Sequence, residues 1–387
     1  DKITIENSFN AKTANWFYIN NPKYEKTEQG LKEYVDAFFK SNKQLRQKYN
    51  IDYSYSYNDR SAIIITFQRF CKLEGDLKPT NFNGMTFKIP AFDDIEATEV
   101  EMMDNTYNAG LIYYDKDKEE TIESFGYDFK SYYAYVMGNT NFKIPTKRGK
   151  LKKILEIPEK IKAGFYKVQI VCNHKDIKKV FAFSKDNIYT HYCLKFAIKY
   201  KEQFNIDINL ITDCDYNCYI YKKSDMIHSS EIFGEWYKYL LNIKNDLKNN
   251  ILVKPLMTQL WATLIKTNKT KKTEEQITEN NFDVGISYTH KYRIINENYD
   301  NDKTIYELQV MENPFLSNIR LKGFITSYAR CMIGEIAIKT GLENIKRIHT
   351  DNIVYRQKQD FNIPNFIAEE KTSGLITWHT NGKYSKN

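Results

Sequence analysis

The sequence predicts an α+β fold built from several subdomains, and three observations support this. At 387 residues, with 42% hydrophobic and 15% aromatic content, the chain can bury a core large enough for two or three subdomains. Residues 164–171 alternate between apolar and polar side chains, which is typical of a half-buried strand. Residues 28–49 carry apolar side chains at helical spacing. We therefore expect strands and helices mixed along the chain, and the sequence contains no internal repeat.

The first half of the chain is expected to be rich in strands. The isoleucine-rich run at 62–67 predicts a strand. Residues 110–114 and 120–129 predict a β-hairpin around the charged turn at 115–118. In the segment 145–220 we expect further strands, with residues 164–171 paired to 180–183 and a helix at 194–200.

Two helices separated by a polar tip are expected in the second half. They span 231–248 and 254–265, and Pro255 stands near the start of the second helix, where proline is tolerated. We expect them to project as an antiparallel pair with Asn249 and Asn250 at the tip. Three more elements complete the chain: a polar loop or hairpin excursion at 266–304, a helix at 320–340, and a strand that follows Gly341 and carries Asp351.

The net charge excludes few functions, whereas the cysteine content predicts the cellular compartment. The chain has 57 Lys and Arg against 49 Asp and Glu, a net charge of +8, which is compatible with a polyanionic partner without indicating one. The cysteines are irregularly spaced; only Cys214 and Cys218 are close, and no further pair completes a zinc site. Free thiols predict a reducing, intracellular compartment and not secretion. No apolar run approaches the roughly 18 residues of a membrane span, so we expect no membrane partner.

Asp128 and Asp351 are the residues that indicate chemistry. Each interrupts an apolar, β-type run, in Asp128-Phe-Lys-Ser-Tyr-Tyr and in His349-Thr-Asp-Asn. Aspartate is common at strand ends and turns, so local structure alone explains either residue. Two such carboxylates brought together would hold divalent metal, as nucleotidyl transfer requires, because two metals about 3.5–4 Å apart stabilise the attacking and the leaving oxygen.

The segment around Asp128 resembles the first polymerase motif of family B DNA polymerases, Asp-x-x-Ser-Leu-Tyr-Pro. Asp128 falls on the metal ligand, Ser131 on the serine and Tyr133 on the tyrosine, while Tyr132 replaces leucine and Ala134 replaces proline. The resemblance implies that the turn at Ser131, Tyr132 and Tyr133 meets the triphosphate. It also implies that the ring of Tyr133 lies under the sugar and excludes a 2′-hydroxyl.

Residues 254–262 resemble the second motif, Lys-x-x-x-Asn-Ser-x-Tyr-Gly, although only Lys254 is identical. Thr258 takes the place of asparagine and Trp261 that of tyrosine. On one helix, Lys254, Thr258 and Trp261 share a face that offers an ammonium group for phosphate and a flat ring for a base pair. A plain amphipathic helix is the alternative. Lys244 and Lys248 on the preceding helix are either further phosphate contacts or solvated surface lysines.

The third motif of the family, Asp-Thr-Asp-Ser, is matched by His349-Thr-Asp-Asn. Thr350 and the essential metal ligand Asp351 are retained, Asn352 replaces serine, and His349 replaces the first aspartate. This replacement lowers the negative charge of the site, so the implied pair of Mg²⁺ ions has Mn²⁺ as an alternative. The alternative is that His349 is not a metal ligand but a histidine packed beside the turn.

Several shorter segments extend the resemblance. Tyr107-Asn-Ala-Gly110 resembles the Tyr-x-Gly-Gly/Ala segment before the first motif, above all in the protein-primed branch, and implies DNA contacts for Tyr107 and Gly110. Lys383 and Tyr384 are candidates for the lysine–tyrosine element that contacts the primer. Residues 92–96 look like the Asp-Ile-Glu motif of the family's exonuclease, but too few residues follow before Asp128, so we expect a surface turn and no complete exonuclease.

The resemblance implies a DNA-directed DNA polymerase with a right-hand core, an antiparallel-sheet palm and short two-helix fingers, acting on template-primer DNA and deoxynucleoside triphosphates in viral or plasmid replication. A terminal protein or other replication subunits are further implied partners. The alternatives are an inactive, nucleic-acid-binding relative and a nucleotidyltransferase of another kind. The expected regions are an N-terminal part at 1–106, palm at 107–145 and 310–387 with a reduced thumb, a strand-rich insert at 146–230 for a primer protein, fingers at 231–265, and a loop insert at 266–309.

Overall fold

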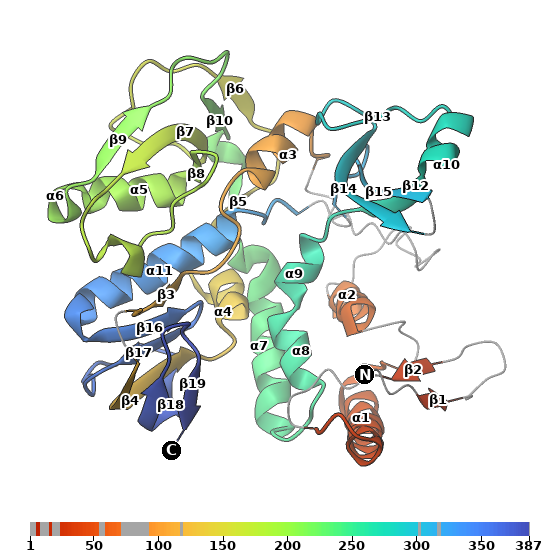
Figure 1. Ribbon diagram of the computed structural model, residues 1–387. Coiled ribbons are helices and arrows are strands. Elements are labelled where there is room, and N and C mark those ends of the chain that lie inside the picture. The colour runs from red at the N-terminus through yellow and green to blue at the C-terminus, as the bar shows by residue number, and fades with distance from the viewer. Residues whose placement is uncertain are drawn as a thin grey trace.

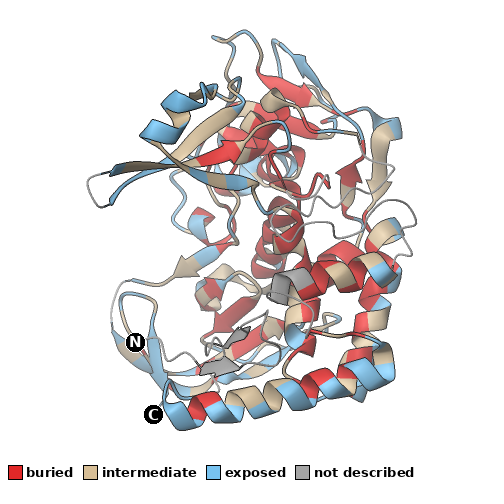
Figure 2. Ribbon diagram, turned by 90° about the vertical axis from the view of Figure 1, so that its right-hand side faces the viewer, coloured by how far each residue is buried: buried red, intermediate tan, exposed pale blue. Residues whose placement is uncertain are grey.

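The computed structural model describes residues 24–53, 59–70, 93–116, 119–300, 303–315 and 319–386, together with the short strands β1 (Ile5–Asn7) and β2 (Asn15–Phe17). It is a mixed α/β structure with curled antiparallel sheets (Figure 1). Buried residues gather in the centre of the molecule and exposed ones on the outer helices and hairpins (Figure 2). Within the described ranges, no helix is both long and apolar enough to cross a membrane.

A six-stranded antiparallel sheet is assembled from distant parts of the chain. Its order is β19-β18-β4-β17-β16-β3, and its strands are β3 (Ile112–Tyr114), β4 (Glu120–Phe129), β16 (Ile345–His349), β17 (Asn352–Tyr355), β18 (Phe366–Trp378) and β19 (Tyr384–Lys386). The predicted hairpin of 110–114 with 120–129 is wrong, because the β16–β17 hairpin lies between these two strands. A hydrophobic pattern alone cannot distinguish two adjacent strands from two strands that are separated by two others.

Ion pairs close the gap that this insertion leaves between β3 and β4. Lys346, whose side chain is 2% exposed, lies 2.7 Å from Glu120 and 3.8 Å from Asp115. Arg356 lies 2.6 Å from Asp115 and 2.7 Å from Glu120. The two acids flank the connection from β3 to β4 and the two bases belong to the inserted hairpin or follow it, so opposite charges alternate across the gap.

The strand-rich insert at 146–230 contains a separate sheet around β7 (Gly164–Val171), which confirms that predicted strand. The predicted pairing of residues 180–183 with β7 is wrong. Strand β8 (Ile188–Thr190) pairs with β7 instead. The run at 180–183 is apolar because Phe181 packs on Tyr189 and Phe196 in the core. The other elements are β6 (Lys150–Lys152), β9 (Asp207–Leu210), β10 (Cys218–Ile220), α5 (His191–Lys199) and α6 (Lys201–Phe204).

The antiparallel helix pair is confirmed but does not project freely. It consists of α7 (Ser230–Asp246), followed by α8 (Val253–Thr258) and α9 (Leu260–Leu264), which meet at Gln259. The tip residue Asn250 is buried and donates its side-chain amide to the carbonyl of Ser41, 2.8 Å away on α1 (Glu28–Tyr49). The tip is therefore covered by the N-terminal region.

The isoleucine-rich run at 62–67 is helical and not a strand, because it belongs to α2 (Asp59–Phe70). Its side chains face an aromatic cluster on α7: Phe67 stacks on Phe233 with centroids 5.5 Å apart and meets Trp236 at 5.3 Å. Tertiary packing thus overrides the β propensity of three consecutive isoleucines.

The polar segment after α9 does contain the predicted hairpin, within a small sheet of order β12-β15-β14-β13. These strands are β12 (Lys269–Thr273), β13 (Val284–Gly285), β14 (Tyr292–Asp300) and β15 (Lys303–Val310), with α10 (Glu274–Glu279) beside them. The remaining elements are α3 (Ala97–Asp104), α4 (Tyr132–Asn139), β5 (Lys143–Pro145), β11 (Met226–His228) and α11 (Phe324–Thr340). Helix α11 is largely buried and lies between the six-stranded sheet and the insert (Figure 1).

Candidate active site

The sheet register brings Asp128 and Asp351 together at one end of the six-stranded sheet. Asp128 is the penultimate residue of β4 and pairs with Asn352, the first residue of β17. The backbone N–H of Phe129 donates to the carbonyl of Asp351 across 2.9 Å. Residues paired across an antiparallel sheet point to the same face, so Ile367, Asp128, Asn352, His349 and Ile112 form one row across it.

The turn that carries Asp351 has an unusual backbone. Thr350 has a φ of 63°, in the left-handed region that a β-branched residue rarely adopts. The turn packs tightly on residues 107–111: Thr350 N–H donates to the carbonyl of Leu111, 2.8 Å away, and a Cβ on Gly110 would stand 2.5 Å from Thr350 Oγ1. Glycine at 110 therefore allows this segment to reach the turn, and Tyr107 lies on the same segment.

Burial, and in second place repulsion between carboxylates, raises the pKa of the acidic residues at the site. Burial raises the pKa of Asp128 to about 7, with further contributions from Asp351 and Glu369, while Lys254 and Lys371 act in the opposite direction. Burial also raises the pKa of Asp351, and Glu369 adds to this, opposed by a hydrogen bond from the residue's own backbone N–H and by His349 and Lys254. We call Asp128, Asp351 and Glu369 the acidic site.

The acidic site fits a divalent cation that takes its remaining ligands from elsewhere. Within the described part of the chain, no three or more His, Cys, Asp or Glu side chains form a ready-made metal cluster. Mg²⁺ is usually bound through one or two carboxylates together with water and substrate phosphates. Raised pKa values of neighbouring carboxyl groups are the electrostatic condition that a bound cation would relieve.

Glu369 and Lys371 are members of this site that the sequence did not indicate. Glu369 lies on β18, where it pairs with Gly126 and accepts a hydrogen bond from the Asn352 amide at 3.0 Å. Both residues belong to a run of three charged side chains that resembles a solvated edge. The register of β18 against β4 places Glu369 on the face of Asp128, whereas Lys371 falls in the irregular stretch between Glu369 and Gly374 and is near enough to lower the pKa of Asp128.

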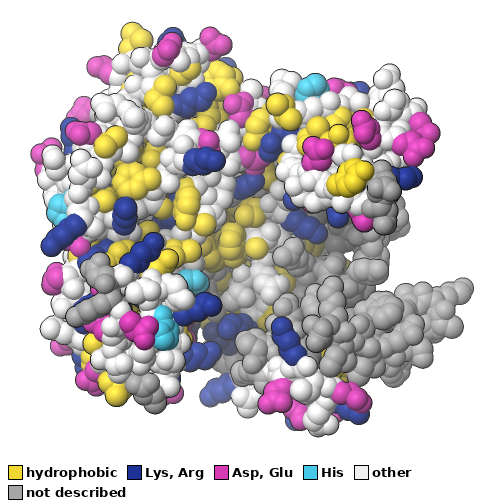
Figure 3. All heavy atoms as spheres, in the orientation of Figure 1, with side chains coloured by type: hydrophobic (Ala, Val, Ile, Leu, Met, Phe, Trp, Pro, Cys, Tyr) yellow, Lys and Arg dark blue, Asp and Glu magenta, His cyan; other side chains and the backbone are white. Residues whose placement is uncertain are grey.

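Lysines of α7 and α8 supply positive charge beside the acids. Lys244 is half-buried and donates to Ser131 Oγ at 3.3 Å; burial and the nearby Lys130 and Lys254 lower its pKa, whereas Asp128 raises it. Of the two readings for this residue, a solvated surface lysine is wrong, although Lys248 is indeed exposed. Lys and Arg side chains gather around a hollow between the six-stranded sheet and these helices (Figure 3).

The turn after Asp128 presents one aromatic ring and buries the other. Ser131 has a φ of 56° and is the residue immediately before α4. Tyr132 is 2% exposed and its hydroxyl donates to the carbonyl of Ala329, so a contact of this residue with the triphosphate would have to come from its backbone. Tyr133 instead lies against Trp261, with ring centroids 4.2 Å apart. Thr258, which the prediction placed on one face with Lys254 and Trp261, donates its hydroxyl to the carbonyl of Lys254.

The C-terminal candidates lie on the β18–β19 hairpin, where no hydrogen bond or ion pair of the described residues joins them to the aspartates. Tyr384 packs on Trp378 at 5.1 Å and lies 5.7 Å from the guanidinium of Arg347. Lys383 is exposed and its N–H bonds to Asn381 within the turn. His349 is exposed beside Asp351.

The exonuclease-like segment is held in a structural network. Phe92 lies outside the described residues. The Arg320 side chain is fully buried and pairs with Asp93 at 2.7 Å and with buried Glu99 at 2.5 Å. Tyr219 donates to Glu96 at 2.7 Å. The expected surface turn is therefore half-buried, and its acids bind other side chains of this chain.

With the site and fold in place, solved structures provide a comparison. The fold is similar to that of phi29 DNA polymerase. The complex of that enzyme with single-stranded DNA superposes with a TM-score of 0.56 at 11% identity, over 96% of this chain and 63% of the other. Its ternary complex with primer-template DNA and incoming nucleotide gives 0.51 at 12% identity, over 89% and 55%. This chain thus has a polymerase-like fold and spans less than two-thirds of the length of these polymerases. No protein-family model and no curated protein sequence matches it.

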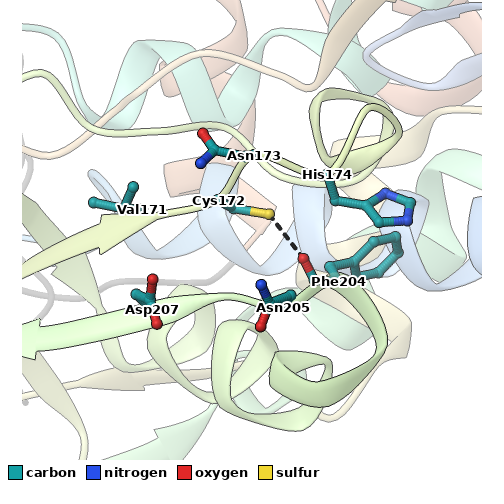
Figure 4. A pocket seen from close by; sticks show the side chains of 7 residues that line it. All are labelled: Val171, Cys172, Asn173, His174, Phe204, Asn205 and Asp207. Atoms are coloured by element: carbon teal, nitrogen blue, oxygen red, sulfur yellow. Dashed lines mark hydrogen bonds between the residues drawn. The ribbon is translucent and has the colours of Figure 1, made fainter.

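A separate cavity lies away from the acidic site. It measures about 220 Å³ and opens at the ends of β7 and β9 in the insert, where Cys172 Sγ donates to the Phe204 carbonyl at 3.1 Å (Figure 4). Its lining contains no residue of the acidic site: Val171, Cys172, Asn173, His174, Phe204, Asn205 and Asp207.

Proposed function

We propose that this chain is a DNA-directed DNA polymerase of the family B, protein-primed type, acting inside a cell in viral or plasmid genome replication. One observation carries the proposal: Asp128 and Asp351, far apart in sequence, meet at the end of one sheet. They do so in a fold similar to that of a DNA polymerase. The raised pKa of each carboxyl group marks a site that gains from bound cations.

Asp128 and Asp351 would hold two Mg²⁺ ions, with Mn²⁺ as the alternative. When bound, the ions supply Lewis-acid activation of the primer 3′-hydroxyl and neutralise charge on the triphosphate. Glu369 is close enough to influence the pKa of both aspartates, so it adds negative charge at the site. This offsets part of the charge lost through His349.

The lysines of α7 and α8 would bind the triphosphate. Lys254 and Lys244 lie close enough to each other to lower the pKa of Lys244, an arrangement that costs free energy unless an anion is bound between them. We assign both to the phosphates, where charge-assisted hydrogen bonds are strong. Lys254 would also donate a proton to the departing pyrophosphate. Tyr133 and Trp261 form a wall for the sugar and the new base pair.

The remaining regions take roles in this scheme that extend the proposal. Residues 107–145 and 310–387 act as palm with a reduced thumb, and 231–265 as fingers. Tyr107, Gly110, Lys383 and Tyr384 contact the template-primer. The inserts at 146–230 and 266–309 face a terminal protein or other replication subunits. Most DNA contacts would be to phosphate, so binding should weaken steeply with salt.

His349 favours a second candidate, a nucleic-acid-binding replication protein with weak or no catalysis. The residue places an exposed imidazole beside Asp351. It occupies the position at which the family motif has a carboxylate. Such a protein would retain the hollow and its lysines but would not catalyse nucleotidyl transfer.

Primer extension on a hairpin template, with Mg²⁺ or with Mn²⁺, separates the two candidates. We expect template-directed addition of deoxynucleotides by the unmodified chain, and none by Asp351→Asn. Asp207→Asn changes an exposed aspartate of the insert and is the matched control, which should extend normally. If the unmodified chain binds the hairpin but adds nothing with either metal, the second candidate is correct.

A further inference from the structure

Strand β18 carries a bulge beside the acidic site. Its regular pairing with β4 ends at Glu369 and resumes at Gly374, so that residues 370–373 stand opposite Phe125 alone. A bulge bends the strand and re-aims its side chains, and bulges are common next to active sites. Glu369 is therefore the last regularly paired residue before the bulge, on the same face of the sheet as Asp128.

Three side chains fix Glu369 at this point. The hydroxyl of Ser373 donates to the Glu369 carbonyl across 2.6 Å. The carboxylate oxygen Oε2 accepts from the Asn352 amide at 3.0 Å and from the Thr372 hydroxyl at 3.3 Å. Asn352 and Thr372 are 6% and 3% exposed, and Thr372 fits here because Gly126 has no Cβ to clash with its hydroxyl. Two buried, neutral donors therefore hold the carboxylate in one orientation.

Within the described part of the chain, no lysine, arginine or histidine forms an ion pair with Glu369. The residue is half-buried, and both of its side-chain hydrogen bonds from described residues go to Oε2 and leave Oε1 without one. Asn352 Oδ1, on the amide that holds the carboxylate, is buried and meets no donor among the same residues. Such groups are costly without a partner. A hydrated cation fits both, because it balances the charge and its waters donate hydrogen bonds.

Positions 349 and 369 both adjoin Asn352 on the acidic face of the sheet. His349 is the cross-strand partner of Asn352 on β16, and Glu369 reaches the Asn352 amide from β18. These are the positions around the two departures from the family motif, which has aspartate at 349 and serine at 352. A carboxylate is thus absent on one side of residue 352 and present on the other, and the longer asparagine is the side chain that holds it.

We propose that Glu369 supplies the third carboxylate of the metal site, held by Asn352, in place of the aspartate that the family motif has at position 349. This inference rests on the function proposed above. Among the described residues the acids form no ready-made metal cluster, so Glu369 acts through water bound to the cation and not as a direct ligand. Mg²⁺ and Mn²⁺ sites depend on such outer partners for affinity and orientation.

The test measures Mn²⁺ binding to the full chain, without DNA or nucleotide, from the loss of the electron paramagnetic resonance signal of the free ion. Asp351→Asn removes a direct ligand and defines the fraction bound at the acidic site. Glu369→Gln keeps the shape of the side chain and removes its charge, so we expect affinity at this site to fall by about tenfold. Glu370→Gln removes the same charge from the exposed neighbouring residue and is the matched control, which should bind like the unmodified chain.

Returning a carboxylate to position 349 separates a role at the metal from a role in the fold. The double variant His349→Asp with Glu369→Gln should regain the affinity of the unmodified chain, because the charge returns on the other side of Asn352. A residue that served only the shape of β18 would not be replaced from β16. Asn352→Ser, which introduces the residue of the family motif, should weaken binding by itself and have no further effect in the double variant.

Three results would overturn the proposal: equal affinities in Glu369→Gln and Glu370→Gln, a loss in Glu369→Gln that His349→Asp does not restore, or no Mn²⁺ binding that depends on Asp351. Asn352→Ser provides a second test that leaves Glu369 unchanged. A chain that binds Mn²⁺ in the expected pattern but extends no primer would support this inference and contradict only the polymerase assignment.

Discussion

The ring of Tyr133 lies against the ring of Trp261, with centroids 4.2 Å apart and planes inclined by 32°. The two residues come from separate segments, one after Asp128 and the other on α9, so their contact joins the turn of the acidic site to the helix pair. Burial raises the pKa of Tyr133 to about 12, so the ring remains neutral at physiological pH. A fixed, neutral ring at this place is suited to sterically excluding a substituent from a bound sugar.

Trimming this ring should relax sugar selection. We expect Tyr133→Ala to raise ribonucleotide incorporation relative to deoxynucleotide incorporation by ~10²-fold, about 3 kcal/mol in relative barrier. The mechanism is loss of a repulsive contact. Competitive single-nucleotide addition measures the ratio. Tyr132→Phe, which removes only the hydrogen bond to Ala329, is the control and should keep the original ratio. Unchanged discrimination in Tyr133→Ala would contradict the assignment.

The carboxylates should be essential for chemistry and dispensable for binding. Asp128→Ala and Asp351→Ala are each expected to abolish nucleotide addition while leaving affinity for a primer-template nearly intact, because the lysines of α7 and α8 are unaffected. Rapid-quench primer extension and fluorescence anisotropy measure the two properties. Activity within about tenfold of the unmodified chain, roughly 1.4 kcal/mol of barrier, would exclude the two-metal assignment.

Part of this site could be predicted from sequence because it rests on short motifs. Short sequence motifs of a few residues indicated Asp128, Ser131, Tyr133 and Asp351. The structure brings the segments that carry them together. Glu369 could not be found in this way, since its place depends on the register of β18 with β4. Within the fold, amphipathic helices such as α1 were predicted to the residue, because local periodicity determines them.

Long-range pairing explains the errors in the fold. The segments of β3 and β4 follow each other in sequence with a charged turn between them, which is the local signature of a hairpin. The β16–β17 hairpin, more than 200 residues later in the sequence, separates them. The helix α2 was mistaken for a strand for a related reason, because its Phe67 packs on Phe233 and Trp236 of α7, which are distant in sequence.

His349 is expected to tune metal preference without being essential. Imidazole nitrogen is a poorer neighbour for Mg²⁺ than for Mn²⁺, so His349→Asp should shift the metal that gives fastest primer extension toward Mg²⁺. Initial rates across a titration of each metal measure the shift. Identical metal dependence in the variant and the unmodified chain would show that His349 is only a neighbour of the turn.

Acid should destabilise the fold through His191. Burial is the largest of the effects that lower the pKa of this residue to about 3, and its Nδ1 accepts a hydrogen bond from Gly164 N–H. Below pH 6.5 the unfolded chain binds a proton that the folded chain does not, so stability falls as pH falls from 6.5 toward 3. At pH 5 the loss from this group is at most about 2 kcal/mol. Urea midpoints at pH 7 and pH 5 should therefore differ less in His191→Gln; an equal difference would contradict the assignment.

Two lysines at the end of the same helix pair provide the sharpest test of triphosphate binding. Lys244 is half-buried, contacts Ser131 and has its pKa lowered by burial and by Lys254, whereas Lys248, four residues later, is exposed. Lys244→Ala should raise the KM for deoxynucleotide by roughly tenfold, the value of one charge-assisted hydrogen bond of about 1.5 kcal/mol. Lys248→Ala removes the same charge and should leave KM unchanged. Steady-state single-nucleotide addition measures both, and equal effects would mean that Lys244 acts only through the net charge of the hollow.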